Sequence, residues 1–273
     1  MFRQFGCLVL LSMPLLAGCA SAPAGGTHAG EPATATTSGH YLARELEIEG
    51  RHYRYAVFVP SRAQPRPLPV VLFLHGSGER GSDGLAQTRA GLGPWLDADA
   101  GSFPALAVFP QVPEGEEWSG VNARMALATL DAASAEFGGD RSRTYLTGMS
   151  MGGYGTWEVA LLAPGRFAAL VPVCGGVLPP RAERPTLRVG AVAGEADPYA
   201  ALVQRLGHVP AWMFHGALDD LVPPADDRRV YRAAREAGAD FRYTEYPEGN
   251  HNAWDATYSD PAMWDWLFAR RLP

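Results

Sequence analysis

Blocks of lysine and arginine are absent from this sequence. Its 273 residues include 23 Lys and Arg against 29 Asp and Glu, which gives a net charge of -6 at pH 7. A nucleic-acid-binding protein needs a concentrated positive surface, so the composition argues against nucleic acids and other acidic polymers as partners. Hydrophobic residues make up 47% of the chain. This content excludes disorder of the whole chain and is enough for one large domain, or at most two small ones.

The apolar run near the start of the chain is too short to form a stable membrane-spanning helix. It covers about residues 5–16, follows Arg3 and ends in small residues, which is typical of a secretory signal. The motif LAGC, which ends at Cys19, resembles the lipobox of bacterial lipoproteins. This resemblance implies a signal peptide over residues 1–18, lasting attachment through acyl chains on Cys19 and, with Ala20 next, the periplasmic side of the outer membrane. The alternative is an ordinary cleaved signal with a chance cysteine.

Cysteine is scarce, with three residues in the whole chain. Cys7 lies in the expected signal peptide and Cys19 would carry the lipid, so Cys174 would be alone in the mature protein. An internal disulfide is then excluded even in an oxidising compartment. Cys174 ends the apolar run FAALVPVC and is predicted to be a buried core residue.

Residues 20–39 contain no bulky apolar residue and no periodic pattern. Their small and polar composition predicts a flexible tether over residues 19–39, between the lipid and the folded domain. The remaining residues, 40–273, have the length of a single α/β domain and contain no internal repeat.

Short β-type runs alternate with helical patterns in this domain. Residues 52–60 alternate like a half-exposed antiparallel strand, whereas residues 69–76 and 105–110 are continuously apolar, like buried parallel strands. The other predicted strands cover residues 143–147, 167–173, 211–215 and 241–246, and the predicted helices cover 123–137, 151–163, 224–237 and 261–270, the last with Asp260 as N-cap. The alternation predicts an α/β fold with a mostly parallel sheet and helices on both faces. Functional residues collect at the carboxyl ends of the strands in such sheets.

The pentapeptide GMSMG around Ser150 fits the pattern G-x-S-x-G, the nucleophile elbow. In this motif a strained turn between a strand and a helix exposes the serine hydroxyl. A side chain at Gly148 or Gly152 would collide with backbone at so tight a turn, and Gly153 lets the helix pack close to the sheet. A P-loop would need a lysine, and a dinucleotide loop needs a different glycine spacing. A structural turn with an inert Ser150 is the remaining alternative.

A serine hydroxyl is a weak nucleophile, so Ser150 requires an acid and a histidine base, in that chain order. His251 follows the last predicted strand and precedes the final helix, and we predict it as the base. His75 and His215 each precede a glycine, where histidine more often fixes loop backbone. The other histidines lie in or beside the tether, before the sheet or at its opposite edge.

Asp219 is the predicted acid. It follows the strand over residues 211–215 and matches the spacing H-G-x-x-D-x-x-V-P of similar hydrolases. Asp220 is adjacent and would point in another direction, as a solvated loop residue. Asp197 and Asp226 are more distant alternatives.

Two backbone N–H groups are expected to bind the oxyanion. Met151 follows the nucleophile, and Ser77 lies in the turn after the strand over residues 69–76, where folds with this elbow take their second donor. Gly76 and Gly78 would let the backbone come close to the substrate, and losing one such donor costs about 10²–10³ in rate. A glycine-rich surface loop is the alternative for this turn.

Four motifs, HGSGERG, GMSMGGYGTW, HGALDDLVP and NHNAW, together resemble those of α/β-hydrolases. The lineage is that of bacterial peptidases and esterases, including dienelactone-hydrolase-like, polyhydroxyalkanoate-depolymerase-like and feruloyl-esterase-like proteins. The resemblance covers residues 40–273. It implies Ser150, Asp219 and His251 as a catalytic triad and no metal or organic cofactor. Because members of this lineage act on different esters, it does not supply a substrate.

The segment over residues 175–210 is longer than the direct connection expected there. It is rich in proline and arginine and long enough for a small flap but not for a large lid, so we predict an open, shallow site. Trp95, Trp118 and Trp254 lie in predicted loops that could border this site and offer flat apolar contacts to a substrate. Ordinary core or surface positions explain these three tryptophans equally well.

The predicted function is hydrolysis of carboxylic esters through an acyl-enzyme on Ser150. Peptide cleavage is the nearest variant, although the large N-terminal propeller of prolyl-oligopeptidase relatives has no counterpart before His52. A surface-anchored binding protein that kept the fold and lost catalysis is a third, less favoured function. The expected substrate is a small or polymeric ester.

Overall fold

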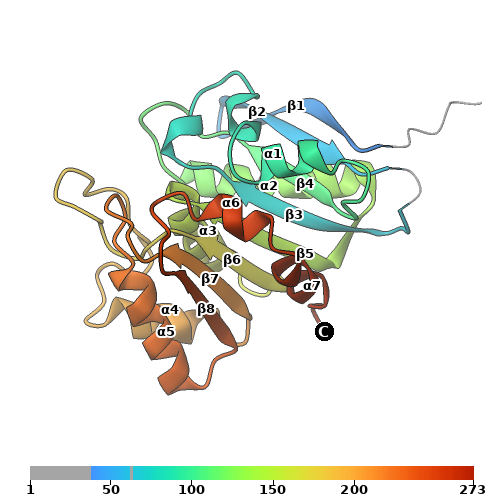
Figure 1. The fold of residues 1–273 in the computed structure, drawn as a ribbon. Helices are drawn as coiled ribbons and strands as arrows, with labels where there is room; N and C mark the ends of the chain where they lie inside the picture. The colour runs from blue at the N-terminus through green and yellow to red at the C-terminus, as the bar shows by residue number, and fades with distance from the viewer. Residues whose placement is uncertain (1–37, 62–63) are drawn as a thin grey trace, which may run out of the picture. The chain divides into compact units, whose positions relative to one another are not determined.

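The computed structural model describes residues 38–61 and 64–273. The predicted signal peptide, Cys19 and nearly all of the predicted tether lie outside the described residues. In these described residues, eight strands form one sheet (Figure 1): β1 (His40–Ile48), β2 (Arg51–Val59), β3 (Leu68–Leu74), β4 (Leu106–Pro110), β5 (Gly139–Met149), β6 (Ala169–Val173), β7 (Ala211–Gly216) and β8 (Phe241–Tyr246).

The strand order across the sheet is β1-β2-β4-β3-β5-β6-β7-β8. Strand β2 pairs antiparallel with β1 and β4, and all the other neighbouring strands pair in parallel. Leu74 at the end of β3 lies opposite Gly148 in β5, and Gly216 at the end of β7 lies opposite Tyr246 in β8. The turns that follow these four parallel strands therefore gather at one edge of the sheet.

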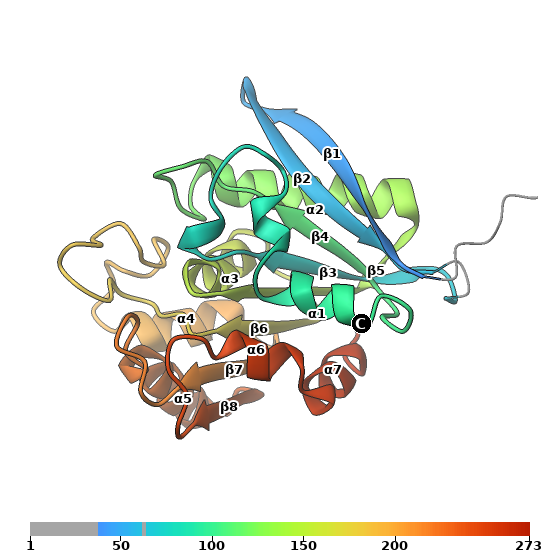
Figure 2. The same cartoon turned by 45° about the horizontal axis from the view of Figure 1, so that its top comes forward.

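Within the part of the chain that the structure describes, seven α-helices cover the two faces of the sheet: α1 (Leu92–Ala98), α2 (Val121–Phe137), α3 (Met151–Leu162), α4 (Pro198–Leu206), α5 (Ala225–Ala237), α6 (Trp254–Tyr258) and α7 (Pro261–Phe268). Helices α2 to α5 pack on one face around Trp157, and α1, α6 and α7 pack on the other around Phe73. Figures 1 and 2 show the second group in front of the sheet. Burial of each large apolar side chain in these layers stabilises the fold by roughly 1.5–3 kcal/mol. The predicted α/β architecture is confirmed.

The strand β1 was not predicted, and it changes the environment of β2. Because β1 covers one edge of β2 and β4 covers the other, β2 is internal rather than half-exposed, and residues 55–59 are buried. The prediction of a half-exposed strand holds only for the first residues of β2. The side chains of β1 are partly buried and partly exposed, as expected of an edge strand that packs with one face.

Three short helices, α1, α4 and α6, were also not predicted. Helix α4 begins with a recognisable cap, since the Asp197 carboxylate accepts hydrogen bonds from the N–H groups of Tyr199 and Ala200 at 3.1 and 3.0 Å. The predicted cap of α7 is confirmed, because Asp260 accepts from the N–H of Ala262 at 2.9 Å.

Two further sequence features are settled by the fold. Cys174 is completely buried just after β6, as predicted, and forms no disulfide within the described residues. Within residues 38–61 and 64–273, no helix combines the length and the apolar character needed to cross a membrane.

Candidate active site

Ser150 occupies a sharp turn between β5 and α3. Its backbone has φ 54° and ψ -117°, a combination that non-glycine residues rarely adopt, and it is the N-cap residue of α3. The turn is held in place because the Ser150 N–H donates to the carbonyl of Val173 at the end of β6, at 2.9 Å. Strain of this kind persists where the surrounding structure fixes it, and it presents the hydroxyl at the edge of the sheet.

The glycines beside Ser150 are required by close backbone contacts. A Cβ on Gly152 would lie 1.8 Å from the carbonyl oxygen of Leu74, and a Cβ on Gly148 would lie 2.3 Å from that of Gly152. A Cβ on Gly153 would lie 2.7 Å from the Cα of Gly175. All three distances are far below a normal contact, so the helix approaches the sheet this closely only with glycine.

Ser150, His251 and Asp219 form a chain of hydrogen bonds. The hydroxyl of Ser150 lies 2.9 Å from Nε2 of His251, and Nδ1 of His251 lies 2.7 Å from Oδ2 of Asp219. The three residues follow β5, β8 and β7, so their side chains meet at the edge where parallel strands end. A histidine held in this way can take a proton from the serine hydroxyl through Nε2.

The loop after β7 fixes the Asp219 carboxylate. Its Oδ1 accepts hydrogen bonds from the N–H groups of Leu221 and Val222, both at 2.9 Å. Burial would raise the pKa of Asp219, but hydrogen bonds from His215 and His251 outweigh it and hold the pKa well below its usual range. The carboxylate therefore stays ionised next to His251.

The alternative acids lie elsewhere. Asp220 is exposed, Asp197 caps α4, and Asp226 accepts from the N–H groups of Val177 and Leu178 at 2.9 and 2.8 Å. None of these three carboxylates is hydrogen-bonded to His251 within the described part of the chain.

Two backbone N–H groups belong to residues beside Ser150, because Met151 follows it in the chain and Ser77 follows Gly76, which lies against it. Met151 is the first residue of α3 and Ser77 is the first residue of a short 3₁₀ helix, Ser77–Glu79. In the described residues neither N–H donates to a protein acceptor, as expected at the start of a helix. Gly76 lies against Ser150, since a Cβ on it would be 3.5 Å from the Cβ of Ser150. Both N–H groups are therefore candidates for binding a developing oxyanion.

Buried His75 holds the loop that carries Ser77. Its Nε2 accepts the N–H of Val112 at 3.0 Å, so its Nδ1 carries the proton and donates to the carbonyl of Gly76 at 2.6 Å. Burial lowers the pKa of His75 to about 4, which keeps the ring neutral. As the sequence predicts, this histidine fixes loop backbone.

Comparison with known proteins agrees with the fold described above. A solved thermostable esterase is 31% identical, superposes with a TM-score of 0.69, and is covered over 63% of its length by 85% of this chain. The acylaminoacyl peptidase of Pyrococcus horikoshii is 16% identical with a TM-score of 0.63, over 86% of this chain and 42% of the peptidase. The protein is an α/β-hydrolase by fold. At 16% identity the peptidase supports the fold alone.

Curated relatives of this α/β-hydrolase are more partial matches. NocK of Nocardia uniformis subsp. tsuyamanensis, named as a putative esterase, is 33% identical over 61% of this chain and 50% of its own length. A secreted protein of Arthroderma benhamiae is 26% identical over 67% of this chain and 21% of its own length. The chain thus spans half or less of the curated relatives that it matches. No family model matches the sequence.

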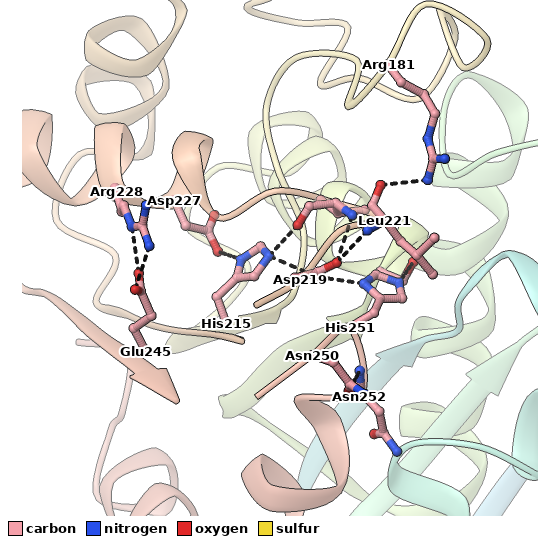
Figure 3. A network of polar contacts seen from close by, with 12 residues as sticks. Arg181, His215, Asp219, Leu221, Asp227, Arg228, Glu245, Asn250, His251 and Asn252 are labelled. Carbon is pink, nitrogen blue, oxygen red and sulfur yellow. Dashed lines mark hydrogen bonds and ion pairs between the residues drawn. The ribbon is translucent and has the colours of Figure 1, made fainter. Parts of the chain in front are cut away.

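A second histidine, His215, lies on the far side of Asp219 (Figure 3). Its Nε2 is 3.2 Å from Oδ2 of Asp219 and 2.8 Å from the carbonyl of Val222, and its Nδ1 is 2.8 Å from Oδ2 of Asp227. The side chains of His215, Asp219 and Asp227 are completely buried. Burial would lower the pKa of His215, but hydrogen bonds to the two carboxylates outweigh it and raise the pKa to about 10.

This cluster was not predicted as part of the site. The sequence predicts for His215 only a role in fixing loop backbone, which its bond to Val222 bears out, and Asp227 is not among the predicted site residues. Two signals were available: His215 and Asp219 lie four residues apart around a turn, and Asp227 lies in the first turn of α5. The cluster makes Asp219 the acceptor of hydrogen bonds from two histidines and two backbone N–H groups, which fixes its orientation.

A cavity of about 400 Å³ opens beside Ser150 and His251. Trp254 lines it and lies edge-on to His251, with ring centroids 5.5 Å apart. Trp95 and Trp118 do not line it. Trp95 lies in α1 rather than in a loop and stacks on Trp264, whereas Trp118 is buried and donates to the carbonyl of His75. Trp95 and Trp118 therefore occupy ordinary packing positions rather than the border of the site.

The segment between β6 and α4 forms one wall of this cavity, through Pro180, Arg181, Arg184 and Leu187. The sequence predicts residues 175–210 to be longer than a direct connection. Part of this length is helix α4, the ordinary crossover helix between two parallel strands. The irregular residues before α4 form the wall.

Proposed function

We propose that the protein is a serine hydrolase that cleaves carboxylic esters through an acyl-enzyme. The observation that carries this proposal is the hydrogen-bonded chain from Ser150 Oγ through His251 to the buried Asp219. The solved thermostable esterase and the relative NocK, named as a putative esterase, support the same chemistry.

In the proposed first half-reaction, Ser150 Oγ attacks the ester carbonyl while His251 Nε2 takes the hydroxyl proton. The N–H groups of Met151 and Ser77 hold the negative charge that develops on the carbonyl oxygen. His251 then passes its proton to the leaving alkoxide as the C–O bond breaks, which leaves the acyl group on Ser150. Asp219 keeps Nδ1 of the imidazole protonated and stabilises the imidazolium.

In the second half-reaction, water takes the place of the alcohol. His251 removes a proton from water, the hydroxide adds to the acyl carbon, and the proton returns to Ser150 as the acid leaves. Every group needed for both halves comes from the chain itself.

Labelling with a fluorophosphonate probe tests the proposal. The wild-type protein is expected to react at Ser150, and Ser150→Ala to show no labelling while unfolding at the same temperature. A folded wild-type protein that fails to label would favour the non-catalytic binding protein instead.

Peptide cleavage is the second candidate, favoured by the acylaminoacyl peptidase neighbour that shares the fold. The catalytic groups serve amides as well as esters, so substrate turnover decides between the two. We expect short-chain nitrophenyl esters to be hydrolysed far faster than peptide anilides. Faster turnover of the anilides would overturn the esterase proposal and leave the serine hydrolase mechanism intact.

We also propose that the protein is exported and anchored to the outer membrane through lipid on Cys19. The lipobox-like motif supports this proposal, and the secreted relative is consistent with export. Cys19→Ser is expected to abolish incorporation of labelled palmitate and to move the protein out of the membrane fraction. Unchanged fractionation of this variant would contradict the lipid anchor.

A further inference from the structure

Arginine side chains line the cavity next to the proposed nucleophile. Arg181 and Arg184 both come from the irregular segment between β6 and α4, and they face the same cavity of about 400 Å³ as Ser150 and His251. An esterase for purely neutral substrates has no evident need for two guanidinium groups at this position. The charged groups around Arg181 and Arg184 therefore decide whether the cavity favours a charged substrate.

Arg184 lies next to the loop proposed to bind the oxyanion. Its Nη2 lies 3.1 Å from Oγ of Ser77 and 3.4 Å from Oε1 of Glu117. The same Glu117 oxygen also lies 3.7 Å from Nη2 of Arg80. Burial, followed by the like charge of Arg184, lowers the pKa of Arg80. The single carboxylate of Glu117 is thus shared by the guanidinium groups of Arg184 and Arg80, and neither of the two contacts is short.

The other charged groups of the lining do not neutralise the arginines. Arg181 donates through Nη2 to the carbonyl of Leu221 at 2.8 Å (Figure 3) and pairs with no carboxylate in the described residues. Glu79 is the acidic residue of the lining, and it forms no ion pair with these arginines within the described residues. Burial raises the pKa of Glu79, which favours its neutral form. The wall of the cavity therefore carries excess positive charge.

We propose that Arg184, together with Arg181, forms a subsite for an anionic group, and that the preferred substrates are carboxylic esters carrying a carboxylate near the scissile bond. This inference rests on the proposed esterase function. A guanidinium group binds a carboxylate through two parallel hydrogen bonds. Because Arg184 contacts the side chain of Ser77, whose N–H would hold the carbonyl oxygen, a carboxylate bound there lies close to the reacting carbonyl. Monoesters of short dicarboxylic acids have this chemistry.

Monomethyl glutarate and dimethyl glutarate form a matched pair of substrates, since they differ by the methyl group that removes the charge. Hydrolysis of either releases methanol, with water supplying the hydroxyl of the acid and the hydrogen of the alcohol. The wild-type protein is expected to show a kcat/KM at least about tenfold higher for the charged ester, as expected for a charge-assisted hydrogen bond. This preference should shrink as NaCl is raised, because salt screens exposed charges.

Substitutions of the subsite arginine separate recognition from structure. Arg184→Gln keeps a planar donor near Ser77 and removes the charge, so it should lower the ratio of the two kcat/KM values about tenfold. Arg184→Lys should restore part of the ratio. Arg188→Gln, in the same segment but outside the lining of this cavity, is the matched control and should leave the ratio unchanged. Equal losses for both esters in Arg184→Gln would mean that Arg184 only supports the loop, and would overturn the proposal.

Binding of glutarate separates failure of the subsite from failure of the esterase function. Calorimetric titration of Ser150→Ala with glutarate should show binding that Ser150→Ala/Arg184→Gln lacks. Binding without hydrolysis of either ester would retain the anionic subsite and reject the esterase function. Hydrolysis of dimethyl glutarate without glutarate binding or a preference for the charged ester would reject the subsite and retain the esterase function.

Discussion

Removing the carboxylate of Asp227 should strongly destabilise the fold, because His215 would lose the partner of its Nδ1–H. Both ring nitrogens of His215 face oxygen acceptors, 2.8 Å from Asp227 at Nδ1 and 3.2 Å from Asp219 at Nε2, so the buried ring carries two protons. Removing one partner of a buried ion pair costs about 3–5 kcal/mol, because the remaining charge is left uncompensated. Asp227→Ala should lower the free energy of unfolding by this amount.

The pKa of His215 gives an independent magnitude. A rise from 6.5 to about 10 corresponds to on the order of 5 kcal/mol of preference for the charged ring in the folded state. Because the folded-state pKa lies above the unfolded value, this stability is fully present below pH 6.5 and is lost as the pH rises to about 10. The difference between wild type and Asp227→Ala should therefore be largest near pH 6 and shrink toward pH 10.

Asp227→Asn is the informative companion variant. Its amide can donate to an unprotonated Nδ1, so a neutral His215 would keep its Nε2–H directed at Asp219. The loss should be below about 2 kcal/mol, since a neutral hydrogen bond replaces the ion pair. Its stability should also lack the decline between pH 6.5 and 10, because His215 is already neutral.

Urea unfolding followed by circular dichroism between pH 6 and 10 measures these differences. In a thermal unfolding experiment on the same variants, a loss of 3–5 kcal/mol corresponds to a fall in Tm of roughly 6–20 °C for a domain of this size. Asp220→Ala, in the same loop but exposed, is the control and should stay within about 0.5 kcal/mol at every pH. The charged-pair interpretation is refuted if Asp227→Ala matches the wild type at pH 6, or if its deficit does not change with pH.

Other substitutions test the proposed acid, the turn that carries Ser150 and the cap of α7. Asp219→Asn should lower kcat by on the order of 10⁴, because the imidazole takes the wrong tautomer, whereas Asp220→Asn should stay within about twofold; comparable losses in steady-state ester hydrolysis would contradict the assignment. Gly152→Ala should give insoluble or unfolded protein, since its Cβ would lie 1.8 Å from the carbonyl of Leu74; a soluble variant with a cooperative melt would mean that the turn can relax. Asp260→Ala should cost about 1 kcal/mol in urea unfolding through loss of the α7 cap; no change would show that water replaces the cap.

The order of strands and helices could be predicted because most of the strands are buried on both faces. Continuous apolar runs such as residues 69–76 have few other interpretations in a chain of this composition. The edge strand β1 has no such run, because one of its faces meets solvent. Helix α4 could have been found from Asp197 followed by Pro198, a cap and first-turn pair. The same Asp197 is one of the alternative acids that the sequence leaves open.

The proposed catalytic residues and the proposed subsite differ in how sequence encodes them. Ser150 and His251 are 101 residues apart, yet each lies in the turn after a predicted strand, and parallel strands bring their carboxyl ends to one edge. Arg184 and Ser77 are 107 residues apart, but Arg184 lies in no helix or strand. Its position therefore depends on how an irregular segment packs. Backbone topology therefore suffices to predict where bond cleavage would occur. The charge that would select the substrate becomes visible only once the side chains of that segment are placed against the cavity.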